Sequence, residues 1–187
     1  MKSKSRQRER LVILSIAVLM FLTGCSEDFM NSNKVLENFI VAVAAGDAEK
    51  VEKFYAPDNE EEEAQVQEEI DSKIAYFKAH SVKEVQVRSV GVIENFTEYS
   101  YLYVVYDLLS ESDKTYPCAD TYFMEKEEEK YYIMPAAQVS EAMAAQATEA
   151  YKVFRKSEPY KTYEKEYQVF MNQNPDYEQK INEKMNV

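Results

Sequence analysis

The chain has 187 residues, of which 45% are hydrophobic, so it can bury the core of one domain, and disorder throughout the chain is excluded. Its formal net charge of −12 at pH 7 repels phosphate backbones, and because no basic patch offsets that charge, no nucleic-acid partner is expected. Only three glycines are present, which excludes a glycine-rich nucleotide-binding loop.

The N-terminus has the parts of an export signal. Five lysine and arginine residues precede an apolar run from Leu11 to Leu22. As a helix, this run would rise only about 18 Å, whereas the hydrocarbon core of a bilayer is about 30 Å thick. A permanent transmembrane anchor is therefore the weaker interpretation.

The end of the apolar run carries a more specific motif. Leu22, Thr23, Gly24 and Cys25 resemble the lipobox of bacterial lipoproteins, in which the cysteine is acylated and becomes the first residue of the mature chain. The alternative is an ordinary export signal with an incidental cysteine.

The lipoprotein resemblance implies that residues 1–24 are a signal peptide, that Cys25 carries the lipid and that residues 25–33 are a short tether. Two or more acyl chains anchor a protein stably, since each buried methylene contributes about 0.8 kcal/mol. The lipid bilayer is therefore an expected partner, and the expected location is the extracytoplasmic face of the cell membrane.

The second cysteine, Cys118, has no partner for a disulfide if Cys25 is acylated. It lies in a strand-like segment and is predicted to be a small packed side chain. The alternative is a catalytic thiol, for which His80, the only histidine, would be the base.

Three helices are predicted between Asn33 and His80 from apolar residues at helical spacing. Gly46 ends the first helix, Asp47 caps the second, and the side chain of His80 is expected to contact the last carbonyls of the third. The residues expected in the core are Leu36, Phe39, Ile40, Val43, Val51, Phe54, Tyr55, Val66, Ile70, Ile74 and Phe77.

No metal ion or cofactor is expected. The acidic run Glu60 to Glu63 suits the first turn of a helix, where carboxylates interact well with the helix dipole. A calcium loop would need spaced oxygen ligands and a glycine, and one histidine cannot form a zinc site.

From Val82 to about Pro135 the apolar period changes to two, which predicts consecutive antiparallel strands, with Gly91 as a bulge. Helices followed by such strands predict an α+β fold, in which N-terminal helices pack on a curved antiparallel sheet. The strand near residue 104 is apolar on both faces, so both must be covered. Its inner face carries Leu102, Val104, Tyr106 and Leu108, and its outer face Tyr99, Tyr101, Tyr103 and Val105.

The phrase GDAEKVEKFYAP, residues 46–57, is similar to the short second helix of nuclear transport factor 2-like domains, the cone-shaped fold shared with ketosteroid isomerase. The resemblance covers residues 34–137. The family contains enzymes, binding proteins and scaffolds, so the fold alone does not convey a function.

Residues 138–187 form a C-terminal extension that departs from this family. Three amphipathic helices are predicted, starting near Val139, at Pro159 and at Pro175, the last with Asn174 as its cap. Because such helices need a surface, we expect them to cover the outer face of the sheet, either in the same chain or in a homodimer.

Ketosteroid isomerase-like chemistry needs a carboxylate base and a hydrogen-bond donor. The weak candidates are the carboxylates Asp107 and Asp120, with Tyr103, Tyr106 and Tyr122 as donors. Strand alternation separates Asp107 from Tyr106, so the sequence secures no catalytic pair. The favoured function is a non-enzymatic binding or interaction module for a small apolar ligand or a protein, and the isomerase-like enzyme is the alternative.

Overall fold

The computed structural model describes residues 28–112 and 114–186, so the predicted signal peptide, the lipobox and Cys25 lie outside the described residues. The helices are α2 (Ser32–Ala45), α3 (Ala48–Glu52), α4 (Glu60–Ala79), the 3₁₀ helix η1 (Ala136–Gln138), α5 (Glu141–Phe154), α6 (Glu158–Gln173) and α7 (Tyr177–Met185). The strands are β1 (Val82–Asn95), β2 (Tyr99–Ser110), β3 (Thr115–Glu127) and β4 (Lys130–Ile133).

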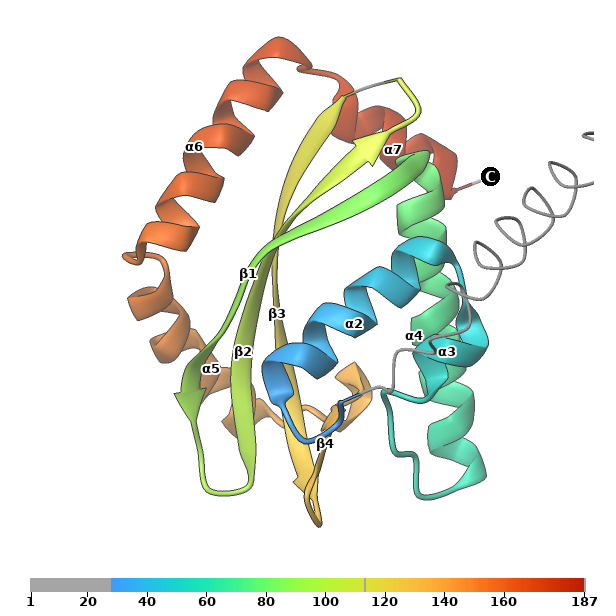
Figure 1. Ribbon diagram of the computed structural model, residues 1–187, viewed down its shortest axis with the longest axis vertical. Coiled ribbons are helices and arrows are strands. Elements are labelled where there is room, and N and C mark those ends of the chain that lie inside the picture. The colour runs from blue at the N-terminus through green and yellow to red at the C-terminus, as the bar shows by residue number, and fades with distance from the viewer. Residues whose placement is uncertain (1–27, 113, 187) are drawn as a thin grey trace, which may run out of the picture.

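Within the described residues, the strands form one antiparallel sheet in the order β1-β2-β3-β4. Helices α2, α3 and α4 lie on one side of this sheet, and α5 and α6 lie on the other (Figure 1). The predicted α+β fold, with N-terminal helices on an antiparallel sheet and a helical C-terminal region, is confirmed.

The N-terminal helices begin and end where the sequence predicts. Gly46 adopts φ 68° at the end of α2, a left-handed conformation that glycine adopts without strain. Asp47 Oδ1 accepts a hydrogen bond from Lys50 N at 3.1 Å and caps α3. All the core residues predicted on these helices are buried.

The prediction of a bulge at Gly91 is wrong. Gly91 pairs directly with Tyr103, and the irregularities of β1 lie elsewhere, after Val82, Val87 and Val92. A Cβ at position 91 would lie 2.8 Å from Tyr103 Cε1. Glycine is needed here because the ring of Tyr103 leaves no room for a side chain.

The outer face of the sheet is covered by the C-terminal helices of the same chain. Val105 packs with Phe154 and Tyr160, and Tyr101 packs with Ala147 and Ala150. Helix α7 contacts α4 beyond the edge of the sheet (Figure 1). It begins at Tyr177 rather than at Pro175, and its N-cap is Asp176, because Asn174 is the C-cap of α6.

The role predicted for the His80 side chain is wrong. Instead of contacting the carbonyls at the end of α4, its Nδ1 lies 3.0 Å from the hydroxyl of Tyr177 on α7. The ring packs against Tyr76, Tyr116 and Tyr177 and is only 3% exposed. Burial, and next the charge of Lys184, lower the pKa of His80 to about 4.

The free energy of unfolding is expected to fall as the pH drops from about 6.5 to about 4. Over this range the unfolded chain binds a proton at His80 and the folded chain does not, so protons favour unfolding. At about 1.4 kcal/mol per pKa unit, the loss is at most about 3 kcal/mol. Urea unfolding at both ends of this pH range measures the loss. The free energy of unfolding of His80→Asn should depend less on pH, and an equally steep pH dependence in the variant would contradict the role of His80.

Candidate functional site

A groove of about 800 Å³ runs along β3, and we call it the β3 groove. Every residue of β3 from Tyr116 to Phe123 lines it. Successive side chains of a strand point to opposite faces, so a groove lined by all of them follows the edge of the strand. Helix α4 forms one wall, and α5 forms the other.

Asp120 and Tyr106 meet inside the β3 groove. Tyr106 pairs with Cys118 across the two strands, and Asp120 lies two residues further along the same face. The Tyr106 hydroxyl donates a hydrogen bond to Asp120 Oδ2 at 2.6 Å. The structure therefore brings together a carboxylate and a donor that the sequence left unpaired.

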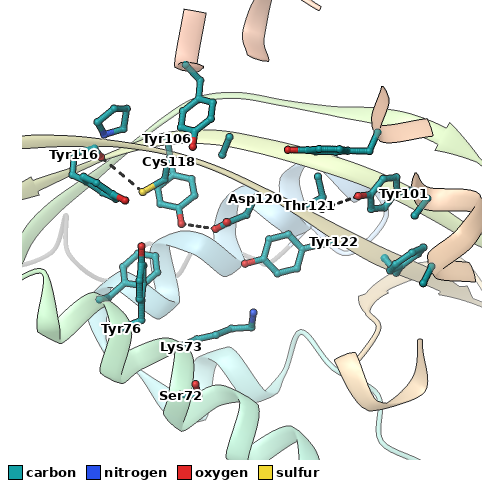
Figure 2. Close-up of a pocket in the computed structure, with 18 of the residues that line it drawn as sticks. Ser72, Lys73, Tyr76, Tyr101, Tyr106, Tyr116, Cys118, Asp120, Thr121 and Tyr122 are labelled. Atoms are coloured by element: carbon teal, nitrogen blue, oxygen red, sulfur yellow. Dashed lines mark hydrogen bonds between the residues drawn. The ribbon is translucent and has the colours of Figure 1, made fainter. Parts of the chain in front are cut away.

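The opposite wall of the groove carries Lys73. Figure 2 shows Asp120 and Tyr122 pointing from β3 toward α4, with Lys73 rising from α4 toward them. Lys73 Nζ lies 3.4 Å from Glu69 Oε1 and 4.9 Å from the centre of the Tyr122 ring. Lys73 is thus held by a carboxylate and an aromatic face, while Asp120 has no ion pair within the part of the chain described.

The electrostatics of Asp120 follow from this arrangement. Burial raises the pKa of its carboxyl above the ordinary 3.8, and the Tyr106 hydrogen bond and the charge of Lys73 work against that rise. Burial also raises the pKa of the Tyr106 and Tyr122 hydroxyls well above 10.0. These hydroxyls therefore stay neutral at pH 7.

The other candidate residues lie elsewhere. Asp107 is on the outer face, where Arg88 Nη2 lies 3.3 Å from its Oδ1. Tyr103, on the same face, stacks on Phe154 with ring centres 4.4 Å apart. Cys118 is buried, and that burial raises the pKa of its thiol well above 9.0, so the thiol stays protonated at neutral pH.

Within residues 28–112 and 114–186, no group of three or more histidine, cysteine, aspartate or glutamate side chains could hold a metal ion. None of the helices described has both the length and the apolar character needed to cross a bilayer.

Sequence reasoning missed Lys73 and the aromatic walls of the groove. Tyr76 and Tyr101 also line it, and Tyr101 donates a hydrogen bond to Thr121 Oγ1 at 2.9 Å. The pairing of β2 with β3 continues from Leu109 and Thr115 to the far end without a shift. The connection between Leu109 and Thr115 is short. If it is taken as a hairpin, the register that follows places Asp120 on the same face of the sheet as Tyr106.

No family model and no curated protein matches the sequence. The chain is similar to a solved protein from Campylobacter jejuni that is provisionally named an NTF2-like transpeptidase, with 19% identity and a TM-score of 0.40 over 55% of this chain and 96% of that one. It is also similar to an NTF2-like protein of unknown function from Shewanella oneidensis, with 16% identity and a TM-score of 0.35 over 54% and 88% of the two chains. A protein of unknown function from Mycobacterium tuberculosis shows 12% identity and a TM-score of 0.38 over 77% and 88%.

Proposed function

We propose that the chain is a lipid-anchored binding module on the extracytoplasmic face of the cell membrane, with an NTF2-like cone whose ligand occupies the β3 groove. The observation that carries the proposal is a carboxylate, Asp120, in an open groove of about 800 Å³. Ligand pockets of proteins have volumes of about 300–1,000 Å³. The lipobox resemblance at Cys25 supports the anchor.

The chemistry of the groove favours a ligand with a positive charge and an aromatic or apolar body. Asp120 is the only carboxylate among the described residues that line the groove, and Lys73 is held by Glu69. Tyrosine rings on both walls offer aromatic faces to a cation and to an apolar body. The net charge of −12 draws cations toward the surface.

Tyramine, a small aromatic amine, is the probe that tests this function. We expect saturable binding by nuclear magnetic resonance titration, with a loss of at least tenfold in affinity in Asp120→Asn, because the variant removes the carboxylate that pairs with the ammonium. The variant should fold normally, since burial disfavours the charge it removes.

Asp107→Asn is the matched control, because it removes a carboxylate from the opposite face of the sheet. It should leave tyramine binding unchanged. Equal affinity in the wild-type chain and in Asp120→Asn, or no saturable binding at all, would contradict the proposal.

The alternative function is proton transfer with Asp120 as general base. The hydrogen bond of 2.6 Å between Tyr106 and Asp120 favours this alternative, since it shows that a carboxylate base and a hydroxyl donor share one groove. However, Asp120 already accepts the hydrogen bond of Tyr106, so a separate donor would have to serve the substrate. If the wild-type chain turns over an enone and Asp120→Asn does not, the chain is an enzyme. If it binds tyramine but turns over no enone, the binding function stands.

A further inference from the structure

We propose that the β3 groove binds an extended peptide, which adds to the free edge of β3 as a further strand and places a lysine or arginine side chain opposite Asp120. This inference rests on the proposed function and names the class of ligand. It follows from the backbone of β3, from the walls of the groove and from its charge.

In the part of the chain that the structure describes, no strand pairs with the outer edge of β3 along most of its length. Strand β4 pairs only with Met124–Glu127. Phe123 O accepts a hydrogen bond from Met134 N at 2.9 Å, so the backbone groups of residue 123 point away from β2. Outward-pointing residues alternate along an antiparallel strand, and because β3 has no irregularity against β2, Ala119 and Thr121 point outward as well.

Within residues 28–112 and 114–186, these outward backbone groups have no partner strand. Among the residues described, no backbone hydrogen bond outside the sheet reaches Ala119 or Thr121. Pro117 occupies the next outward position, where a missing N–H costs no sheet hydrogen bond. An unpaired edge is a template for strand addition, in which the backbone hydrogen bonds of the ligand provide affinity.

The walls of the groove suit a single extended chain. Helix α4 contributes Lys73 and Tyr76 on the inner side (Figure 2). Helix α5, on the outer side of the sheet, contributes Ala147 and Thr148. Side chains of an added strand would alternate between these two walls. Because both helices flank the edge, a lone peptide fits the groove better than the folded edge of a second copy.

Charge decides which peptide is favoured. Side chains that lie directly opposite each other on neighbouring strands have Cβ atoms about 5 Å apart, within reach of an ion pair. Asp120 lies on the inner wall without an ion pair in the described part of the chain, whereas Lys73 has Glu69 as its partner. A basic side chain at that position of the peptide would therefore meet a carboxylate that has a hydrogen bond from Tyr106 but no ion pair among the described residues.

The probe is a blocked seven-residue peptide of alternating threonine and valine with a central lysine, added to the full chain in phospholipid nanodiscs. Binding should slow amide hydrogen exchange at Ala119 and Thr121, and replacing the lysine with glutamate should weaken binding at least tenfold. Peptides N-methylated on one or the other alternate set of amides should differ at least tenfold, because only one set faces β3.

N-methylation of the peptide separates this inference from the proposed function, because it changes the backbone hydrogen bonds of the ligand and leaves the groove intact. One methylated set should lose peptide binding at least tenfold, and the unaltered protein should still bind tyramine. Tyramine binding without peptide binding would overturn strand addition alone, and binding of neither would overturn both proposals. Protection of Ala119 and Thr121 that rises with protein concentration, not with peptide, would overturn the inference in favour of a second copy.

Discussion

Removal of residues 138–187 is expected to abolish the cooperative fold or make the chain insoluble. The removed segment contributes buried side chains to the protein, at Ala147, Ala150, Phe154, Tyr160, Phe170 and Ile181. Burial of one large apolar side chain is worth about 1.5–3 kcal/mol, and a whole domain is stable by only about 5–15 kcal/mol. Truncation would also expose the aromatic outer face of β2, an aggregation hazard. Circular dichroism melting and sedimentation measure both effects.

A pair of neighbouring residues on α5 gives this prediction a control. Phe154 is 5% exposed and stacks on Tyr103, whereas Val153 is 70% exposed. Phe154→Ala should lower the free energy of unfolding by about 3–5 kcal/mol, and Val153→Ala should change it by less than about 0.5 kcal/mol. A truncated chain with unchanged solubility and melting would contradict the role of the C-terminal helices as part of the core.

Cys25→Ser is expected to abolish lipid attachment, and any variant chain whose signal is cleaved should no longer be retained by the membrane. If the thiol of Cys25 carries the acyl chains, serine cannot accept the thioether-linked lipid, and with no lipid the acidic chain has no other strong attraction to a bilayer. The variant should be released into the medium or remain unprocessed without lipid label. Cell fractionation and labelling with a radioactive fatty acid measure both outcomes.

The matched control is Cys118→Ser, because Cys118 is a buried free thiol of β3. Lipid label and membrane retention should persist in this variant. Normal retention of Cys25→Ser with its signal peptide cleaved would refute lipid attachment at Cys25.

Local signals in the sequence predict much of the fold. Gly46 and Asp47 place the boundary between α2 and α3, because a left-handed C-cap and an N-cap depend on adjacent residues. The period of two along β2 assigns Tyr106 to the inner face and Tyr103 to the outer face, as the structure has them. Periodicity and capping need no knowledge of distant partners.

The β3 groove could not be predicted in the same way. It depends on where β4 stops pairing with β3 and on how α4 and α5 flank the remaining edge, which are contacts between segments far apart in the chain. The errors at Gly91 and His80 have the same origin. Gly91 is fixed by the ring of Tyr103 on the next strand, and His80 by Tyr177 on α7.

The Asp120 carboxyl is the centre of the account, and its titration tests the account most directly. Burial should raise its pKa above the ordinary 3.8 in the free chain. A bound ammonium stabilises the charged carboxylate, so saturating tyramine should lower that pKa. Carbon-detected nuclear magnetic resonance titration of the Asp120 side chain, with and without tyramine, measures both values. A raised pKa that falls on binding is the predicted result, and a pKa that does not change under saturating tyramine would contradict Asp120 as the anchor of the ligand.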